Sequence, residues 1–328
     1  MSELVTADLG EGKKSKQKER VRIVRRPLHG VLLLDKPKGI SSNDALQKVK
    51  WLLRAEKAGH TGTLDPLATG LLPICLGAAT KFSQMHLDAD KQYEAIAQLG
   101  IKTSTGDAEG EVIAKREVIV TDDLLQSVLK RFLGSIEQVP PMHSALKKDG
   151  KALYEYARAG LEVERLARIV TIHALSGVFV NQSAIKLIVS CSKGTYIRTL
   201  AEDIGEALGC GAHLSSLRRT ATGGFDVKEC VTIEDLEAMN EEQRLAHLLP
   251  VDAMLDGHVK IDLDTEDAQR FTNGLSRKGA WPDAMQVAVY EKNSLTLLGV
   301  GQVRNGELHP ERLLSKLEIE QMNMATAH

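Results

Sequence analysis

Segments with the pattern of β-strands and segments with the pattern of α-helices alternate irregularly along this chain. Residues 31–34, "VLLL", form a short apolar run that leads into a Pro-Gly loop. The next segment, "SSNDALQKVKWLLR" (41–54), offers helix N-cap candidates at Ser42 and Asn43, followed by apolar residues at helical spacing. Such interspersed elements limit the chain to folds in which helices and a sheet share a core.

The same alternation continues downstream. Thr121 is the expected cap of one helix and Gly209 the expected terminator of another. The order of elements is not the regular βαβ repeat of a doubly wound fold. The sequence therefore predicts an α+β domain with a mixed, largely antiparallel sheet flanked by helices. Strands are expected over 71–77, over 91–100 and in two runs within 161–192, and helices over 121–134 and 196–209.

Changes in composition divide the chain into domains. Residues 28–230 hold the elements described above and form the larger domain. Residues 231–250 are acidic, helical in pattern and end in proline, as expected of a helical linker. Residues 251–315 read as a small β-rich module with short turns between its strands.

Composition indicates an ordinary cytoplasmic protein. Of the 328 residues, 43% are hydrophobic and 26% are charged, and no apolar run is long enough to span a bilayer. The first residues lack the apolar core of a signal peptide. The four cysteines form no CxxC pair and no histidine pair has zinc-ligand spacing, so we expect free thiols, no bound metal and no disulfides.

Positive charge is concentrated near the N-terminus, although the net charge of the whole chain is only −2. Residues 13–26 hold eight Lys or Arg and one Glu. Such a run could bind several phosphates, or it could be a solvated, disordered tail. We expect disorder over residues 1–27 and again over residues 316–328.

One carboxylate stands alone in the stretch "AGHTGTLDPLATGLLP" (58–73). No second acid occurs between Glu56 and Asp88, so paired-carboxylate chemistry is excluded within this segment. Asp65 is followed by proline, which is ordinary turn chemistry. The chain has no GxxxxGK[ST], GxGxxG or GxSxG motif. Asp65 is therefore either a turn residue or the single acid of an enzyme that positions its substrate strongly.

The segment around Asp65 resembles a known family. "GHTGTLDPLATGLLPICLGAATKF" (59–82) is similar to the catalytic motif of the TruB-type tRNA pseudouridine synthases, bacterial enzymes that isomerise uridine 55 in the T-arm of tRNA. The C-terminal segment is similar to a PUA domain, a small RNA-binding β-barrel. The resemblance covers about residues 28–315. Four other segments resemble further motifs of the family in the same order, namely "LLLDKPKGISSN", "KQYEA", "SKGTYIRTLAEDIG" and "GAHLSSLRRTATGGF".

The resemblance implies a reaction that needs neither cofactor nor metal. The uracil N1 to ribose C1′ bond breaks, the base turns, and C5 bonds to C1′, so substrate and product are isomers. The position of Asp65 implies that it is the nucleophile. Attack at C1′, attack at C6 and abstraction of a ribose proton all stay open. Most glycosidases, which also act at an anomeric carbon, use two carboxylates instead.

Other roles follow from the same resemblance. Arg198 would pair with Asp65 and keep it ionised, because an adjacent cation lowers the pKa of a carboxylate. Tyr93 would stack on the uracil and could remove the C5 proton. Tyr196 and Leu217 would complete the pocket wall. Without the resemblance, Arg198 would be read as a helix-surface residue, Tyr93 as a cross-strand aromatic and Leu217 as core.

Binding of a uridine stacked inside tRNA also requires that the base be extruded. The resemblance implies that His60 fills the gap left in the RNA. Lys36 and Lys81 are candidates for phosphate contact or for packing within their motifs. The expected partner is the T-arm stem-loop of tRNA. No obligatory protein partner or membrane is expected, and we expect a monomer.

Two other functions compete with an RNA-modifying isomerase. A tRNA-binding folding factor could use the same T-arm clamp without chemistry, but it would not need Asp65, Tyr93 and Arg198 together. A hydrolase using His60 and Asp65 would lack a nucleophilic Ser or Cys motif.

Overall fold

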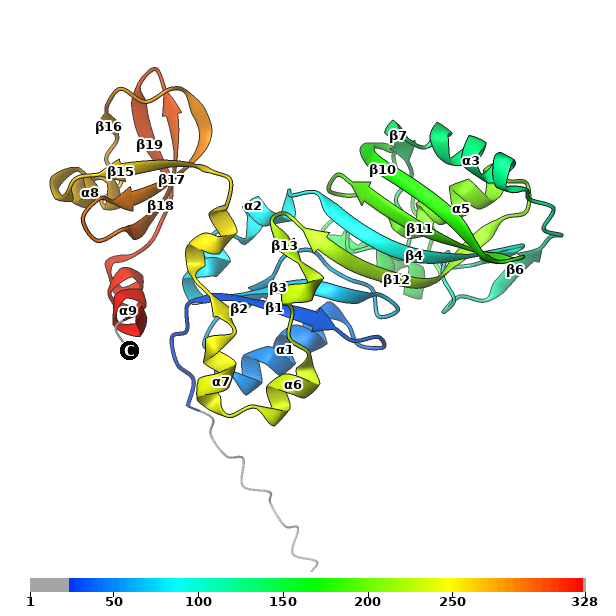
Figure 1. Cartoon of the computed structure of the whole chain (residues 1–328), viewed down its shortest axis with the longest axis horizontal. Helices are drawn as coiled ribbons and strands as arrows, with labels where there is room; N and C mark the ends of the chain where they lie inside the picture. The colour runs from blue at the N-terminus through cyan, green and yellow to red at the C-terminus, as the bar shows by residue number, and fades with distance from the viewer. Residues whose placement is uncertain (1–23, 327–328) are drawn as a thin grey trace, which may run out of the picture.

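The computed structural model describes residues 24–326, which form a large helix-covered sheet with a smaller sheet beside it (Figure 1). Most of the expected basic tail, residues 1–27, thus lies outside the described residues. Within them the large sheet has ten strands, of which β2 (Ala58–His60) pairs with β3 and β13 (Phe225–Asp226) pairs with β12. The other strands follow the order β14 (Leu248–Leu249), β1 (Gly30–Lys36), β3 (Thr69–Leu76), β12 (Ala212–Thr222), β4 (Lys91–Leu99), β11 (Ala184–Cys191), β10 (Arg168–Asn181) and β7 (Gly134–Gln138).

Strand directions in the large sheet are mixed. Among the described residues, β12 and β3 form its one parallel pair, and all its other pairs are antiparallel. In the parallel pair Arg219 is aligned with Gly70. Gly70 has φ +99°, and a Cβ there would lie 2.2 Å from the carbonyl oxygen of Arg219, so only glycine fits. The predicted mixed, largely antiparallel sheet is confirmed.

Strand β1 is buried on both faces, which explains its uninterrupted apolar run. Leu32 and Leu34 face the main core, which they share with helices of the larger domain. Val31 and Leu33 face a second core that contains residues of the C-terminal module. Because successive side chains of a strand point to opposite faces, both cores meet across this one strand.

Helices cover the large sheet, and α1, α3, α6 and α7 begin at side-chain caps. The N-cap of α1 is Ser41, not Ser42 or Asn43 as predicted, because Ser41 and Asp44 form a reciprocal capping box. Thr121 caps α3 as predicted. The helices of the larger domain are α1 (Ser42–Leu52), α2 (Ser83–Leu87), α3 (Asp122–Arg131), α4 (Leu153–Arg158), α5 (Ile197–Ala207), α6 (Ile233–Ala238) and α7 (Glu241–Ala246).

Residues 231–250 are helical as expected, but they are packed into the larger domain. Helices α6 and α7 lie beside α1 below β1 (Figure 1). Strand β14 pairs with β1, which aligns Leu248 with Leu32. Leu236 belongs to the main core. This segment therefore extends the sheet and is more than a connector.

The C-terminal module is a curled sheet with five strands among the described residues, as expected of a PUA-like domain (Figure 1). Helix α8 (Thr265–Thr272) packs against it through Phe271. The strand order is β15 (Val259–Leu263), β17 (Ala284–Glu291), β18 (Thr296–Arg304), β19 (Glu307–Leu313) and β16 (Arg277–Lys278).

Residues 316–326 form helix α9 (Lys316–Thr326), so the expectation of disorder was wrong for this stretch. Ile319 packs against the second core, which gives the helix an apolar contact. Lys81 Nζ donates to the carbonyl oxygen of Leu313 (2.9 Å) and to Glu318 Oε2 (2.6 Å). These contacts hold α9 between the two sheets, and no local pattern in "EIEQMNMATAH" indicated them.

All four cysteines are free thiols, as predicted.

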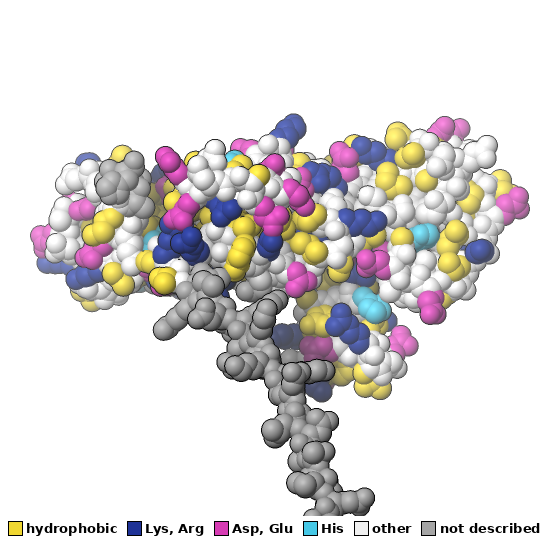
Figure 2. All heavy atoms as spheres, turned by 90° about the horizontal axis from the view of Figure 1, so that it is seen from below, with side chains coloured by type: hydrophobic (Ala, Val, Ile, Leu, Met, Phe, Trp, Pro, Cys, Tyr) yellow, Lys and Arg dark blue, Asp and Glu magenta, His cyan; other side chains and the backbone are white. Residues whose placement is uncertain are grey.

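The surface carries both signs of charge, and the remaining elements are short. Basic and acidic side chains are interspersed on the face seen in Figure 2. No helix of the described chain is both long and apolar enough to cross a membrane. The short elements are η1 (Gly77–Lys81), β5 (Ile101–Thr103), β6 (Val112–Lys115), β8 (Lys147–Lys148), β9 (Lys151–Ala152), η2 (Val227–Glu229) and η3 (Val251–Leu255).

Replacing Lys81 with Met should lower the free energy of unfolding by about 1 kcal/mol or more, because Leu313 O loses its side-chain donor and Glu318 loses its cation. Urea denaturation of the full chain measures this. Lys186→Met is the matched control, since the Lys186–Glu94 pair joins two more exposed side chains on the sheet surface. The control should change stability by less than ~0.5 kcal/mol. Equal losses in both variants would contradict a docking role for Lys81.

Candidate active site

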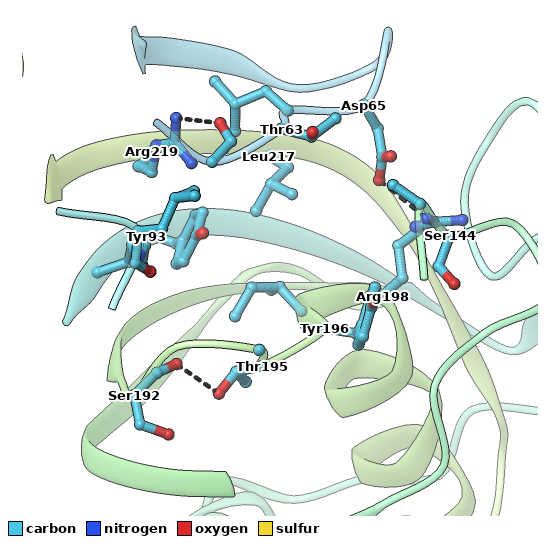
Figure 3. Close-up of a pocket in the computed structure, with 17 residues that line it drawn as sticks. Thr63, Asp65, Tyr93, Ser144, Ser192, Thr195, Tyr196, Arg198, Leu217 and Arg219 are labelled. Atoms are coloured by element: carbon cyan, nitrogen blue, oxygen red, sulfur yellow. Dashed lines mark hydrogen bonds and ion pairs between the residues drawn. The ribbon is translucent and has the colours of Figure 1, made fainter. Parts of the chain in front are cut away.

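A cavity of about 250 Å³ lies between the loop after β2, strands β4 and β12, and the N-terminus of α5 (Figure 3). Residues 144–145 and 192–195 close further sides of it. The cavity therefore collects segments that are distant in sequence. Its walls include five of the predicted site residues, namely Asp65, Tyr93, Tyr196, Arg198 and Leu217.

Asp65 and Arg198 form an ion pair at one end of this cavity. Arg198 Nη2 lies 3.0 Å from Asp65 Oδ2, and the Arg198 side chain is only 6% exposed. The guanidinium also donates to the carbonyl oxygens of Thr105 (3.2 Å) and His143 (2.6 Å). Its Nη1 lies 3.6 Å from the buried carboxylate of Asp107. Because these partners fix the guanidinium, they also fix the position of the Asp65 carboxylate.

The backbone at Asp65 forms a turn, which was the alternative interpretation of this residue. Its carbonyl oxygen accepts a hydrogen bond from Ala68 N (3.0 Å). Ser42 Oγ accepts from Leu64 N (2.7 Å) and donates to Leu64 O (2.9 Å), so the start of α1 holds the loop. The turn uses only the backbone of Asp65. Its carboxylate, 38% exposed, is left to face the cavity.

Burial sets the direction of the Asp65 pKa. Partial removal of the carboxylate from water raises its pKa above the ordinary value, and the nearby Asp107 adds to the rise. The Arg198 guanidinium acts in the opposite direction, as predicted, but it does not outweigh burial. Arg198 therefore favours the ionised form of Asp65, against the effect of burial.

Aromatic and aliphatic side chains form the walls of the cavity. Tyr93 on β4 and Leu217 on β12 are each 8% exposed. Tyr196 immediately precedes α5, and its backbone is held by Gln138, whose Oε1 accepts from Tyr196 N (2.7 Å) and whose Nε2 donates to Tyr196 O (3.1 Å). Burial raises the pKa of both phenols, so the neutral form of each is favoured. Such walls suit a planar, uncharged ring.

The remaining predicted residues lie outside this cavity. His60 lines a neighbouring cavity of about 550 Å³ that shares Asp65 and Arg198 with the first. Burial lowers the pKa of His60, and its Nδ1 has no hydrogen-bond partner among the described residues. Lys36 is fully buried, and its Nζ donates to Pro37 O (2.9 Å) and Ile40 O (2.8 Å). Burial lowers the pKa of Lys36 to about 8. Lys81 makes the packing contacts with α9 described above.

Two buried charges near the cavity were missed from the sequence. Asp107 lies in a loop after β5, where an isolated Asp-Ala pair carries no signal. Arg219 lines the cavity wall and is 1% exposed. Its neighbour Arg218 turns to the other face and pairs with Asp35 at 2.6 Å. Two consecutive arginines on a strand point to opposite faces, and recognising residues 212–222 as a strand could have found Arg219.

Comparison with known proteins places the chain among pseudouridine synthases. Its fold matches the structure of an H/ACA RNP bound to a substrate RNA containing 2′-deoxyuridine, with a TM-score of 0.67, 25% identity and coverage of 89% of this chain and 86% of the other. A chain of the archaeal box H/ACA sRNP Nop10-Cbf5 complex matches with a TM-score of 0.66, 25% identity and coverage of 93% and 91%. The fold thus belongs to the pseudouridine synthase class.

Family models match most of the described chain. Residues 50–197 match the TruB family pseudouridylate synthase N-terminal domain, residues 198–256 the tRNA pseudouridylate synthase B C-terminal domain, and residues 260–314 the C-terminal domain of pseudouridine synthase II TruB. The tRNA pseudouridine synthase B of Verminephrobacter eiseniae is 60% identical over 92% of this chain and 94% of its own length. That of Ralstonia nicotianae is 58% identical over 88% and 95%. The chain belongs to the TruB family of pseudouridylate synthases.

Replacing Arg198 with Gln should raise the pKa of the Asp65 carboxyl further, because the group that opposes burial is removed. NMR titration of [¹³Cγ]Asp-labelled protein, with Asp65 assigned by its loss in Asp65→Asn, measures the shift. Arg218→Gln is the control, since Arg218 pairs with Asp35 and should leave Asp65 unchanged. An unchanged or lowered pKa in Arg198→Gln would contradict this account of the site.

Proposed function

We propose that this protein isomerises uridine 55 in the T-arm of tRNA to pseudouridine, with Asp65 as nucleophile. The observation that carries the proposal is the Asp65–Arg198 pair at the end of a cavity walled by Tyr93, Tyr196 and Leu217. Asp65 is the one carboxylate among the residues that line this cavity. The similarity to tRNA pseudouridine synthase B proteins over most of the chain supports tRNA as the substrate.

The chemistry needs an ionised Asp65. The N1–C1′ bond breaks and a C5–C1′ bond forms, so the product is an isomer and no group is gained or lost. Attack at C1′, attack at C6 and abstraction of a ribose proton all use the carboxylate, not the carboxylic acid. Because burial raises the pKa of Asp65, turnover should fall as the pH drops through that pKa. Arg198 serves this step by favouring the ionised form.

Tyr93 is suited to contact the uracil ring. Its ring stands in the wall of the cavity, where it can stack on uracil, and its phenol points inward (Figure 3). After C5 bonds to C1′, C5 carries a hydrogen that must leave to restore the ring. In this proposal the Tyr93 oxygen accepts that proton. Arg219, beside the phenol, favours the phenolate that this role requires.

His60 is suited to contact the RNA from which the uridine is extruded. It lies in the cavity next to Asp65, on the other side from Tyr93. Burial and the positive charge of Arg219 both lower its pKa, so the ring is neutral at neutral pH. A neutral ring with a free nitrogen can stack in the gap that the uridine leaves.

We also propose that a single chain acts on free tRNA without a protein partner, and that it does so in the cytoplasm.

Asp65→Asn should abolish turnover and leave tRNA affinity within about tenfold of the wild type, because phosphate contacts dominate affinity. Carbodiimide-primer extension on an unmodified tRNA transcript maps the product, and filter binding gives the affinity. Asp44→Asn, an exposed change in the first turn of α1, should keep full turnover. Near-wild-type product from Asp65→Asn would leave binding, as in an RNA folding factor, as the function of the site.

Tyr93→Phe should keep the stacking surface but reduce single-turnover product formation by ~10²-fold or more, the usual scale for loss of a general base. Quenched single-turnover kinetics at saturating enzyme measures it. Tyr156→Phe, which removes a phenol from a residue that lines neither cavity, controls for a general effect of removing a phenol. A wild-type rate in Tyr93→Phe would reduce Tyr93 to a stacking residue.

A further inference from the structure

Arg219 is a buried cation without a carboxylate partner. Its side chain is 1% exposed, and none of the ion pairs formed within residues 24–326 includes it. Its Nε donates to Leu71 O (2.7 Å) and its Nη2 to Gly62 O (3.0 Å), both uncharged acceptors. Burial of a charge that no opposite charge balances costs stability. Because this burial costs stability, we expect Arg219 to have a function in the cavity wall.

The backbone is shaped to admit this side chain. Gly62 has φ +82°, and a Cβ there would lie 3.2 Å from Arg219 Nη1. Gly70 admits the Arg219 backbone in the same way, as described for the parallel pair. Gly62 begins the loop that carries Asp65, three residues farther on. The bond from Arg219 to Gly62 O therefore ties strand β12 to the base of the Asp65 loop.

Arg219 also contacts Tyr93 from the neighbouring strand. The two residues are aligned in the antiparallel pairing of β12 with β4. Three groups influence the phenol: Arg219 from β12, Cys191 from β11 and Asp65 from the loop. Burial, Cys191 and Asp65 all raise the pKa of Tyr93, whereas the charge and hydrogen bond of Arg219 lower it. Arg219 is the cation that acts on this phenol, since Lys91 Nζ is turned to the carbonyl oxygen of Leu87 (2.7 Å).

We propose that Arg219 is a positioning residue that holds the Asp65 loop and the Tyr93 phenol at a fixed separation across the cavity. Its planar fork donates to Leu71 O and Gly62 O from two different nitrogens, a geometry that lysine lacks, and Tyr93 is its aligned neighbour on β4. The positive charge of Arg219 also lowers the pKa of the Tyr93 phenol, against the effect of burial. The consequence for catalysis rests on the proposed function. The contact with the phenol does not, because it exists without RNA.

The first test measures the phenol directly. 3,5-Difluorotyrosine placed at position 93 lowers the phenol pKa into a convenient range, and ¹⁹F NMR of the full chain without RNA follows its ionisation. Arg219→Gln should move the midpoint to higher pH. Arg218→Gln, one residue away and on the opposite face, should leave it unchanged. A folded Arg219→Gln protein with the wild-type midpoint would overturn the proposal.

The second test separates position from charge and needs only a conservative change. Arg219→Lys keeps the charge but loses the fork, so the ¹⁹F midpoint should stay nearer to wild type than in Arg219→Gln. The single-turnover rate on a tRNA transcript should still fall by about tenfold or more, with Kd for the transcript within about threefold. A wild-type rate in Arg219→Lys would refute the positioning role, and this holds even if Arg219→Gln does not fold.

The two tests also distinguish failure of this inference from failure of the proposed function. If the wild-type protein forms no pseudouridine in tRNA, the function is wrong, yet the ¹⁹F midpoints still decide whether Arg219 acts on Tyr93. If the wild-type protein is active and the ¹⁹F midpoint is the same in Arg219→Gln as in the wild type, the inference alone is wrong.

Discussion

The insertion of β12 between β3 and β4 is the constraint on which the site depends. It pairs in parallel with β3 and antiparallel with β4, and Gly70 is required where β3 and β12 meet. This arrangement places the Asp65 loop, which leads into β3, opposite Tyr93 on β4. Leu217 and Arg219, both on β12, then fall between them. A shift of one residue in this register would turn each of these side chains to the other face of the sheet.

Burial shifts the pKa values of the site residues more than their ion pairs do. Asp65 is buried enough that its pKa rises despite a cation at 3.0 Å. Arg198 pairs with both Asp65 and Asp107, so one cation faces two carboxylates. Arg219 has no acid to share and acts on several neighbours, including Tyr93, His60 and Lys36. Two buried arginines thus make different contacts: Arg198 pairs with the Asp65 carboxylate, and Arg219 donates to the backbone of the Asp65 loop and of β3.

The C-terminal module is joined to the larger domain by packing as well as by the chain. Val31 and Leu33 of β1 share a core with Ala288, Tyr290 and Val300 of the module. Helix α9 adds the contact between Lys81 and Glu318. Because β1 also borders the main core, the module is attached to the same strand that supports β3 and the Asp65 loop. An RNA that touches both parts would therefore meet a surface of defined geometry.

Local sequence determined the element types, the caps at Thr121 and Gly209, and the isolation of Asp65, because these depend on near neighbours and on the period of each element. Motif resemblance identified the five residues that line the cavity. Tertiary structure decided what each charge does. Ser42 serves the Asp65 loop and not its own helix, Lys81 binds α9, residues 316–326 are ordered by packing, and Arg219 lies beside Tyr93. These depend on contacts between segments far apart in the chain, and a pKa or an ion pair exists only once such segments meet.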